Sequence, residues 1–483
     1  MPTITSLGIG SGIDVNSMVT QLVALERQPL KQMQKAAGTI QTQLSAFGRV
    51  QSLVSSLRDA ADALNRPALW SGSTPTSSDA TVVTASGTSA PVGSYAVAVN
   101  SLASGQTLAS STAFGARSDL VGAGQLTIGL GSWDAGATTF TPKSGATPVA
   151  ITVDAADTLE TLRDKINASG AGVSASLVSD ASGVRLALNS TETGAANGFR
   201  ITVSDGDGND TDGAGLSRLA YDPPSGASSM QRAQAASDAQ ATVNGIAVTS
   251  ASNVLSGVVE GLTIQLGKVS AQPVQLSVAS DKASVQKALQ SFADAYNALA
   301  REVAAQTKYD PTTKVGAPLQ GDSSVLTLLN RMRGIVNVPS SASSLFPTLS
   351  SIGLEMQRDG TLSPNQGKLD AALANLPEAK NALSNLDVAS PANDGFAQRA
   401  ARLASDLLGV EGRLTTGQAA LQKRLQRNSD DQDALNRRVD AYQQRLVRQF
   451  SAMDTQVAKL QALGSYVNQQ MSALGRLNGS NGR

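Results

Sequence analysis

Residues 431–474 read DQDALNRRVDAYQQRLVRQFSAMDTQVAKLQALGSYVNQQMSAL, and this stretch decides how the chain is organised. Its large apolar residues recur at steps of three and four, close to a heptad repeat, with one four-four stutter at Phe450. The stripe consists of Leu435, Val439, Tyr442, Leu446, Phe450, Met453, Val457 and Leu460. Arg, Lys, Asp and Gln lie between them, so the pattern predicts an amphipathic helix with a solvated outer face.

A second stripe with the same spacing lies near the N-terminus. It consists of Leu30, Met33, Ala37, Ile40, Leu44, Phe47, Val50, Val54, Leu57, Ala61 and Leu64. The pattern leaves two interpretations open. Either these are ordinary helices that pack on a globular core, or they form a coiled coil that joins the termini to each other and to other subunits.

The energetics of burial favour the coiled coil. Burying one large apolar side chain is worth about 1.5–3 kcal/mol, so leaving eight of them wet would forgo roughly 12–24 kcal/mol. A helix over residues 431–474 would also run about 65 Å, which is longer than a small domain is wide. We therefore expect these helices to need partner helices. The predicted partner seam comprises Leu30, Met33, Ile40, Leu44, Phe47, Val54 and Leu57, together with the whole stripe Leu435–Leu460.

The composition excludes several classes of function. The chain has 483 residues, 38 basic and 38 acidic side chains, 3% aromatic residues and neither His nor Cys. The length suggests about three domains, and the balanced charge makes nucleic acid an unexpected partner. Without imidazole or thiolate groups, we expect no cofactor and no metal site. The opening residues do not resemble a secretory signal peptide, and no apolar run reaches the roughly 18 residues that span a bilayer.

Local signals predict individual elements between the two stripes. Asp14 is a candidate N-cap for a helix over 15–26, and Asp157 with Glu160 predicts a capped short helix. Asn244-Gly245 lies between alternating apolar residues and predicts a two-residue hairpin. Pro377 is expected to end a short helix. The apolar face predicted for the helix over 15–26 consists of Met18, Val19, Leu22 and Leu25.

We predict an α+β multidomain fold, in which long terminal helices form a coiled-coil domain and a helical domain accompanies two β-rich domains nested in the middle. The predicted segments are a leader and coiled-coil helices (1–70), the first part of a β-rich domain (71–106), an inserted outer β-rich domain (107–235), the second part of the first β-rich domain (236–280), a helical domain with a small hairpin (281–425), and a C-terminal coiled-coil helix with a loose tail (426–483).

Three weak signals in the sequence bear on chemistry. The glycine run 8–12 resembles a phosphate loop, but no Lys-Ser/Thr pair follows it, so we expect a flexible leader. The acidic run 205–212 resembles a calcium loop, but Asp210 stands where that loop needs Gly. Scattered Asp and Glu residues leave a glycosidase-type pair as a minor alternative. No catalytic constellation emerges, and we expect a protein that is not an enzyme.

Several runs, in this order, resemble the bacterial flagellar filament cap family, also called flagellar hook-associated protein 2. They are GIGSGIDVNSMVTQLVALERQPL (8–30), VVEGLTIQL (258–266), FADAYNAL (292–299), YDPTTKVGAPLQGDSSVLTL (309–328) and SIGLEMQRDGTL (351–362). Residues 151–190, with TLETLRDKINASGAGVSASLV, are similar to a small module that recurs in flagellins and cap proteins. The resemblance covers both ends of the chain and most of its middle.

The resemblance implies a structural protein that leaves the cell through flagellar type III export and forms a ring-shaped homo-oligomer at the distal tip of the filament. There it would promote folding and insertion of exported flagellin. The implied partners are other copies of the chain, flagellin, hook-filament junction proteins and an export chaperone that binds the C-terminal helix. Alternatives are another axial component, such as a junction protein, or an adhesin whose outer β-rich domain binds host surface glycans.

Overall fold

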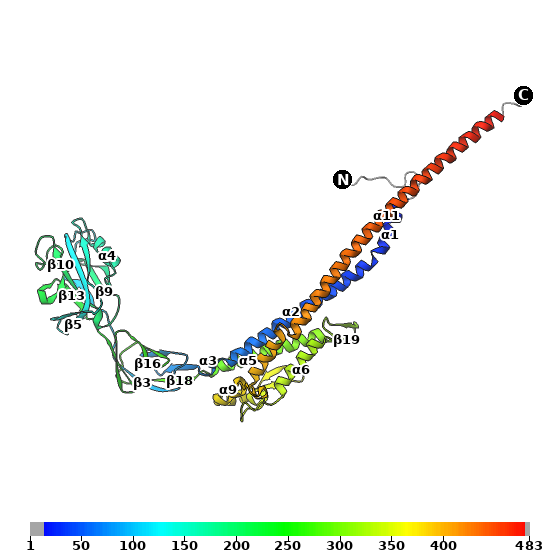
Figure 1. Cartoon of the computed structure of the whole chain (residues 1–483). Helices are drawn as coiled ribbons and strands as arrows, with labels where there is room; N and C mark the ends of the chain where they lie inside the picture. The colour runs from blue at the N-terminus through cyan, green and yellow to red at the C-terminus, as the bar shows by residue number, and fades with distance from the viewer. Residues whose placement is uncertain (1–13, 479–483) are drawn as a thin grey trace. The chain divides into compact units, whose positions relative to one another are not determined.

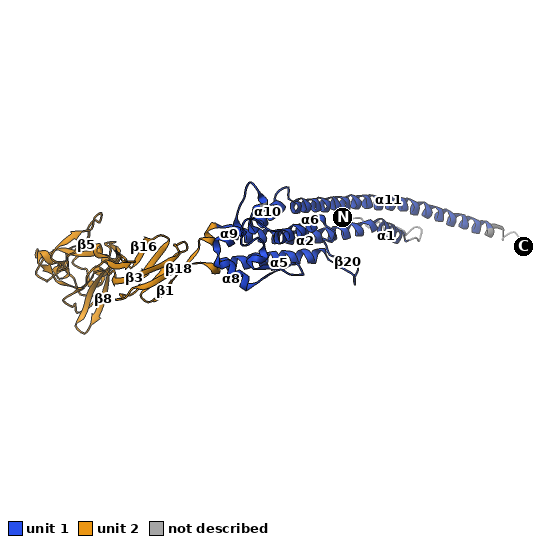
Figure 2. Ribbon diagram, turned by 90° about the horizontal axis from the view of Figure 1, so that it is seen from below, with its two compact units in different colours: residues 1–66, 285–483 blue, residues 67–284 orange. Residues whose placement is uncertain are grey.

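The computed structural model describes residues 14–478, and it divides the chain into two compact units (Figures 1 and 2). One unit contains residues 1–66 and 285–483, and the other contains residues 67–284. The first is dominated by helices and the second by strands, so the predicted α+β fold with long terminal helices and a β-rich middle is confirmed. The glycine run at 8–12 and the predicted tail after residue 478 lie outside the described residues.

The helical unit begins with a capped helix, as the sequence predicts. Helix α1 (Val15–Glu26) starts after Asp14, whose carboxylate accepts a hydrogen bond from the backbone N–H of Ser17 at 2.9 Å. Pro29 lies in the first turn of α2 (Gln28–Asn65), where a missing N–H leaves no helical bond unmade. The remaining helices are α5 (Lys282–Thr307), α6 (Ser323–Asn337), α7 (Leu349–Ile352), α8 (Gln366–Ala374), α9 (Leu376–Ser384), the 3-10 turn η4 (Pro391–Asn393), α10 (Phe396–Leu408) and α11 (Arg413–Asn478).

The core of this unit forms where α2 packs against α10 and the start of α11. The ring of Phe47 lies against Gly417, where an added Cβ would come within 3.2 Å of the ring. Arg49 of α2 pairs with Glu302 of α5 at 2.9 Å. Two short hairpins complete the unit: β19 (Tyr309–Asp310) with β20 (Val315–Gly316), and β21 (Leu354–Met356) with β22 (Leu362–Pro364).

The β-rich unit starts with the short helix α3 (Pro67–Trp70) and contains two hydrophobic clusters. The cluster built from residues 82–103 and 239–278 lies between a sheet of order β1-β18-β3-β14-β15 and a sheet of order β16-β17-β2. These strands are β1 (Ser73–Ser77), β2 (Val83–Ser86), β3 (Gly93–Ser101), β14 (Ala239–Val243), β15 (Ile246–Ser250), β16 (Val254–Val259), β17 (Leu262–Leu266) and β18 (Val274–Ser280). Asn244 and Gly245 both have positive φ between β14 and β15, so the predicted hairpin is confirmed.

The other cluster of this unit lies between residues 108 and 230. Two sheets enclose it: β13-β4-β9-β8, and β12-β11-β10-β5-β6 with β7 also paired to β5. The strands are β4 (Thr107–Ser110), β5 (Gly124–Trp133), β6 (Phe140–Pro142), β7 (Val149–Val153), β8 (Val173–Asp180), β9 (Gly183–Ser190), β10 (Gly198–Asp205), β11 (Tyr221–Asp222), β12 (Ala227–Ser228) and β13 (Met230–Gln234). Helix α4 (Leu159–Ala168) and the 3-10 turns η1 (Ala195–Asn197), η2 (Ser217–Leu219) and η3 (Pro223–Ser225) complete it.

Two local predictions are wrong. The N-cap of α4 is Thr158 rather than Asp157, because the Thr158 hydroxyl accepts from the Thr161 N–H, and Thr161 rather than Glu160 completes the capping box. Pro377 does not end a helix, because α8 already stops at Ala374 and the proline lies in the first turn of α9.

Candidate assembly site on the terminal helices

Helix α1 lies along the middle of α11 and runs in the opposite direction (Figure 1). Three of its valines, Val15, Val19 and Val23, are buried in a cluster with α11 residues. They recur every four residues because one face of a helix repeats at i and i+4. Their partners in the buried part of the cluster are Leu435, Val439 and Leu446. Helix α1 therefore supplies the cover that the first part of the α11 stripe needs.

One ion pair joins α11 to the residue that follows the C-terminal end of α1. Arg27 Nη2 lies 3.7 Å from Asp440 Oδ1, and both side chains are more than half exposed. An exposed pair of this length contributes little stability, because water screens the charges. The guanidinium of Arg445 lies 5.5 Å from the Tyr442 ring centroid, which covers one side of that ring. Apolar packing therefore holds the two helices together.

The cover ends abruptly along α11. Residues at steps of seven occupy nearly the same face of a helix, and six of them can be followed in order. Their exposed fractions are 1% for Val439, 8% for Leu446, 38% for Met453, 66% for Leu460, 50% for Val467 and 58% for Leu474. We call the residues of this face from Met453 to Leu474 the distal stripe. Within the described residues, the distal stripe is an apolar helix face with little covering it.

The structure places the predicted seam residues in three different environments. Those that gather around the α1–α11 cluster are Leu30, Met33, Leu435, Val439, Tyr442, Leu446 and Phe450. Four others are buried in the helical unit, where α2 packs against α10 and α11: Ile40, Phe47, Val54 and Leu57. Leu44 is half-buried on the same helix. The remaining three are Met453 and Leu460, which are exposed, and Val457, which is half-buried.

The predicted apolar face of α1 is right in part. Val19 is buried and Met18 packs against the α1–α11 cluster, but Leu22 is 38% exposed and Leu25 is 62% exposed. The other buried residues of α1 are Val15 and Val23. A strict i, i+4, i+8 count on β-branched residues would have found them, because a short helix on a single neighbour buries only a narrow stripe.

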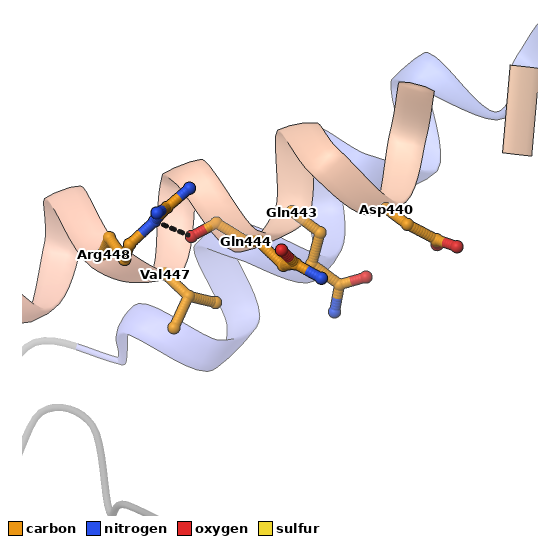
Figure 3. A pocket seen from close by; sticks show the side chains of 5 residues that line it. All are labelled: Asp440, Gln443, Gln444, Val447 and Arg448. Atoms are coloured by element: carbon orange, nitrogen blue, oxygen red, sulfur yellow. Dashed lines mark hydrogen bonds between the residues drawn. The ribbon is translucent and has the colours of Figure 1, made fainter. Parts of the chain in front are cut away.

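A shallow hollow opens on α11 beside α1 (Figure 3). It has a volume of about 560 Å³ and is lined by Asp440, Gln443, Gln444, Val447 and Arg448. Arg448 Nε donates a hydrogen bond to the backbone carbonyl of Gln444 at 3.3 Å. All the lining residues belong to one helix, so no second element converges on the hollow as a small-molecule site requires. The chemistry suits a neighbouring helix better than a ligand.

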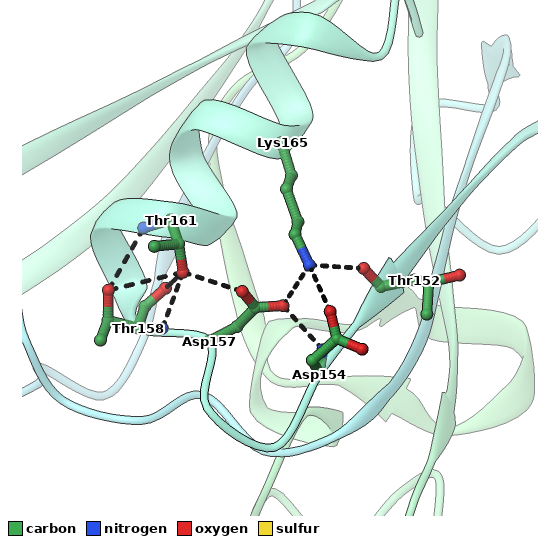
Figure 4. A network of polar contacts seen from close by, with 6 residues as sticks. All are labelled: Thr152, Asp154, Asp157, Thr158, Thr161 and Lys165. Atoms are coloured by element: carbon green, nitrogen blue, oxygen red, sulfur yellow. Dashed lines mark hydrogen bonds and ion pairs between the residues drawn. The ribbon is translucent and has the colours of Figure 1, made fainter.

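A network of polar contacts lies elsewhere, at the start of α4 (Figure 4). Lys165 Nζ contacts Asp157 Oδ2, Asp154 Oδ2 at 2.9 Å and the Thr152 carbonyl at 3.2 Å. Burial opposes ionisation of Asp157, but hydrogen bonds from Lys165, the Asp154 N–H and Thr161 outweigh it and lower the pKa of that carboxyl. The same carboxylates raise the pKa of Lys165. Lys165 stays charged in this environment and links α4 to the end of β7.

Residues 14–478 contain no group of three Asp or Glu side chains arranged to hold a metal ion. In the same part of the chain, every helix is too short or too polar to serve as a bilayer span. The paired terminal helices and the distal stripe thus form the main candidate site.

Comparisons with known proteins agree on one family. The model of the flagellar hook-associated protein 2 C-terminus matches residues 236–462, the model of its N-terminus matches residues 11–106, and the flagellin hook IN motif matches residues 137–192. The B-type flagellar hook-associated protein 2 of Pseudomonas aeruginosa is 33% identical over 94% of this chain and 95% of its own length. Flagellar hook-associated protein 2 of Escherichia coli K12 is 28% identical over 97% of this chain and 98% of its own length.

A solved structure supports the same assignment. The crystal structure of the D1-D2-D3 domains of the flagellar cap protein FliD from Escherichia coli superposes with a TM-score of 0.59 at 29% identity. The match covers 78% of this chain and 99% of that structure. The likeness thus extends from the sequence to the arrangement of helices and sheets. On these grounds the chain belongs to the flagellar hook-associated protein 2 family, the filament cap proteins of the bacterial flagellum.

Proposed function

We propose that this chain forms a homo-oligomeric cap at the distal tip of the flagellar filament and promotes the folding and insertion of flagellin subunits there. The observation that carries the proposal is the distal stripe, from Met453 to Leu474, which the described residues leave exposed. A soluble monomer gains nothing from a long apolar helix face in water. A copy that packs its stripe on a different surface of its neighbour removes that stripe from water, and head-to-tail contacts of this kind can close into a ring.

The proposed partners follow from the same surface. Other copies of the chain and flagellin would meet the terminal helices at the filament tip, and hook-filament junction proteins are a further proposed partner. Before export, an exposed stripe is a hazard for aggregation, so an export chaperone on the C-terminal helix fits the chemistry. The absence of Cys keeps the chain free of disulfides that would oppose passage through a narrow channel. The proposed location is outside the cell, at the filament tip.

The test uses two double variants that introduce the same charges at the same spacing. Leu460→Asp with Val467→Asp places two carboxylates on the distal stripe, whereas Ala462→Asp with Gln469→Asp places them on the opposite side of α11, where the side chains are also exposed. We expect cells with the first variant to release unpolymerised flagellin into the medium and cells with the second to keep normal filaments. Normal filaments with both variants, or with residues 431–483 deleted, would contradict the proposal.

Electron microscopy of labelled protein separates the cap from its alternatives. Label at the filament tip alone is the expected result. Label at the base would favour a junction protein, and label along the whole filament would favour a surface adhesin.

A further inference from the structure

We propose that the outer edge of strand β8 is a latent pairing site for the β8 strand of a second copy of this chain, and that the side-chain amide of Asn167 keeps this edge closed. Within the described residues, β8 is the last strand in the sheet of order β13-β4-β9-β8, so one of its sides has no neighbouring strand. The N–H and C=O groups along such a side can bind an extended strand of another chain. This site lies in the β-rich unit, so the inference goes beyond the proposed function and does not depend on it.

Asn167, near the end of α4, occupies the edge at Ala175. Its Nδ2 donates a hydrogen bond to the Ala175 carbonyl at 3.0 Å, and its Oδ1 accepts one from the Ala175 N–H at 2.7 Å. A neighbouring antiparallel strand makes the same two hydrogen bonds to one residue. Because the backbone groups of alternate residues point to the same side of a strand, those of Leu177 and Ser179 point to the same outer side as those of Ala175. Asn167 therefore reduces the open edge to Leu177 and Ser179.

The composition of β8 offers no other protection against pairing. Residues 173–179 read VSASLVS, without a charged residue or a proline, and Val178 is 52% exposed. Strand β13, at the opposite edge of the same sheet, carries Arg232 and has a register shift against β4 between Arg232 and Gln234. Charged side chains and irregular register are ordinary ways in which proteins protect a sheet edge. Since this stretch of β8 has no charge and β8 keeps a regular register with β9, the amide of Asn167 takes over this role.

A second β8 strand is the occupant because this uncharged edge is complementary to itself. Outward groups bond only to outward groups, so an antiparallel pair centred on Leu177 would join Ala175 of each copy to Ser179 of the other. No like charges would meet there, since residues 173–179 carry none. Asn167 prevents this register by holding both backbone groups of Ala175. The pairing that remains available is confined to Leu177 and Ser179, and so short an edge holds another chain poorly.

Two asparagine variants that lose the same kind of hydrogen bonds test the role of Asn167. Asn167→Ala opens the edge at Ala175. Asn253→Ala is the matched control, because Asn253 makes the same pair of hydrogen bonds to Ala103, at 3.0 Å and 2.7 Å. Ala103 lies outside the described strands, so its release opens no sheet edge.

Contact between β8 strands is measured by a disulfide between two full-length chains, one with Ser176→Cys and one with Val178→Cys. These positions lie directly opposite each other in the pair centred on Leu177, and the chain contains no other Cys. Under mild oxidation, we expect the mixed disulfide to form at least about tenfold faster in the Asn167→Ala background than with Asn167 intact or with Asn253→Ala. The rate should rise with protein concentration.

Ser179→Pro separates strand pairing from a general loss of structure. It removes an outward N–H at an exposed position and leaves the hydrogen bonds to β9 in place, so adding it to Asn167→Ala should return the disulfide rate to that of the natural amide. Equal rates for Asn167→Ala and Asn253→Ala would overturn the proposal, and so would a fast rate that Ser179→Pro leaves unchanged. The distal stripe is the same in every background, so a failure here leaves the proposed function untouched.

Discussion

Helix α4 and the distal half of α11 are both amphipathic, yet their apolar side chains have opposite fates. In α4, Leu159, Leu162 and Ile166 are fully buried against the sheets around them, and Thr158 caps the helix start. In α11, the heptad positions beyond Leu446 are one-third to two-thirds exposed. The apolar face of α4 is fully covered within one chain, whereas the distal part of the α11 face is exposed. The comparison teaches that the same helical pattern can report a core or a site for a partner, depending on what lies next to it.

The largest expected effect comes from removing the exposed distal part of α11. A chain that ends before Met453 keeps the contacts of Val439 and Leu446 with α1 but loses the distal stripe. Four apolar side chains at about 1.5 kcal/mol each amount to on the order of 6 kcal/mol of association, so self-association should weaken by at least about 1,000-fold. Mass in solution over a range of concentrations measures this. Equal masses for truncated and full chains would mean that the stripe does not join copies.

A matched pair of leucine substitutions sharpens the comparison. Leu162→Ala in α4 should lower the free energy of unfolding by about 3 kcal/mol, because it leaves a cavity among fully buried neighbours. Leu460→Ala in α11 should change it by no more than about 0.5 kcal/mol, because the side chain already meets water. Denaturant unfolding followed by the fluorescence of Trp70 and Trp133, both in the β-rich unit, reports on the first and helical circular dichroism on the second. Equal losses would mean that Leu460 is covered in the monomer.

A smaller effect is expected from acid, which should weaken the Asp157–Lys165 network at the start of α4. The pKa of Asp157 is lowered in the folded chain, so its ionised form contributes stability that is fully present above the unfolded pKa, near 3.9. This contribution is lost as the pH falls through the folded value. The difference in unfolding free energy between the natural chain and Asp157→Asn should therefore be constant near pH 6 and shrink below about pH 4. A difference that is unchanged at pH 3 would contradict the role of the Lys165 network.

The smallest expected effect concerns the ion pair beside the covered part of α11. A double-mutant cycle with Arg27→Ala and Asp440→Ala should give a coupling of about 0.3 kcal/mol, because both side chains are largely solvated. Thermal unfolding of the four proteins at low salt measures it. A coupling above about 1 kcal/mol would show that charge, rather than the valines of α1, holds the two helices together.

The sequence predicts those features that depend on local chemistry. Asp14 caps α1, Asn244-Gly245 turns a hairpin, and the stripe from Leu435 to Leu460 lies on one helix, because each depends on residues close in the chain. Strand β5 was not predicted, since Gly129 and Gly131 interrupt its apolar alternation. Gly131 is explained only by the fold: a Cβ there would come within 2.5 Å of the Phe140 ring on the neighbouring strand.

The candidate site was predictable as a pattern but not as a set of contacts. Spacing alone cannot tell that Phe47 and Val54 are buried by helices of their own chain while Leu460 is not, because both stripes have the same period. The burial of each stripe depends on its neighbours. Helix α10 is far from α2 in the sequence, and only part of the apolar face of α1 was predicted correctly. Tertiary neighbours, and not the stripe itself, decide which residues remain available to a partner.

The seven-residue repeat of α11 also makes its apolar face nearly identical from one heptad to the next. From Val439 to Leu474 the same position returns every 10.5 Å or so, always with an aliphatic side chain or methionine. No polar residue at this position singles out one alignment, as a buried Asn does in many coiled coils. A partner helix displaced along α11 by one heptad would therefore meet an equivalent apolar position.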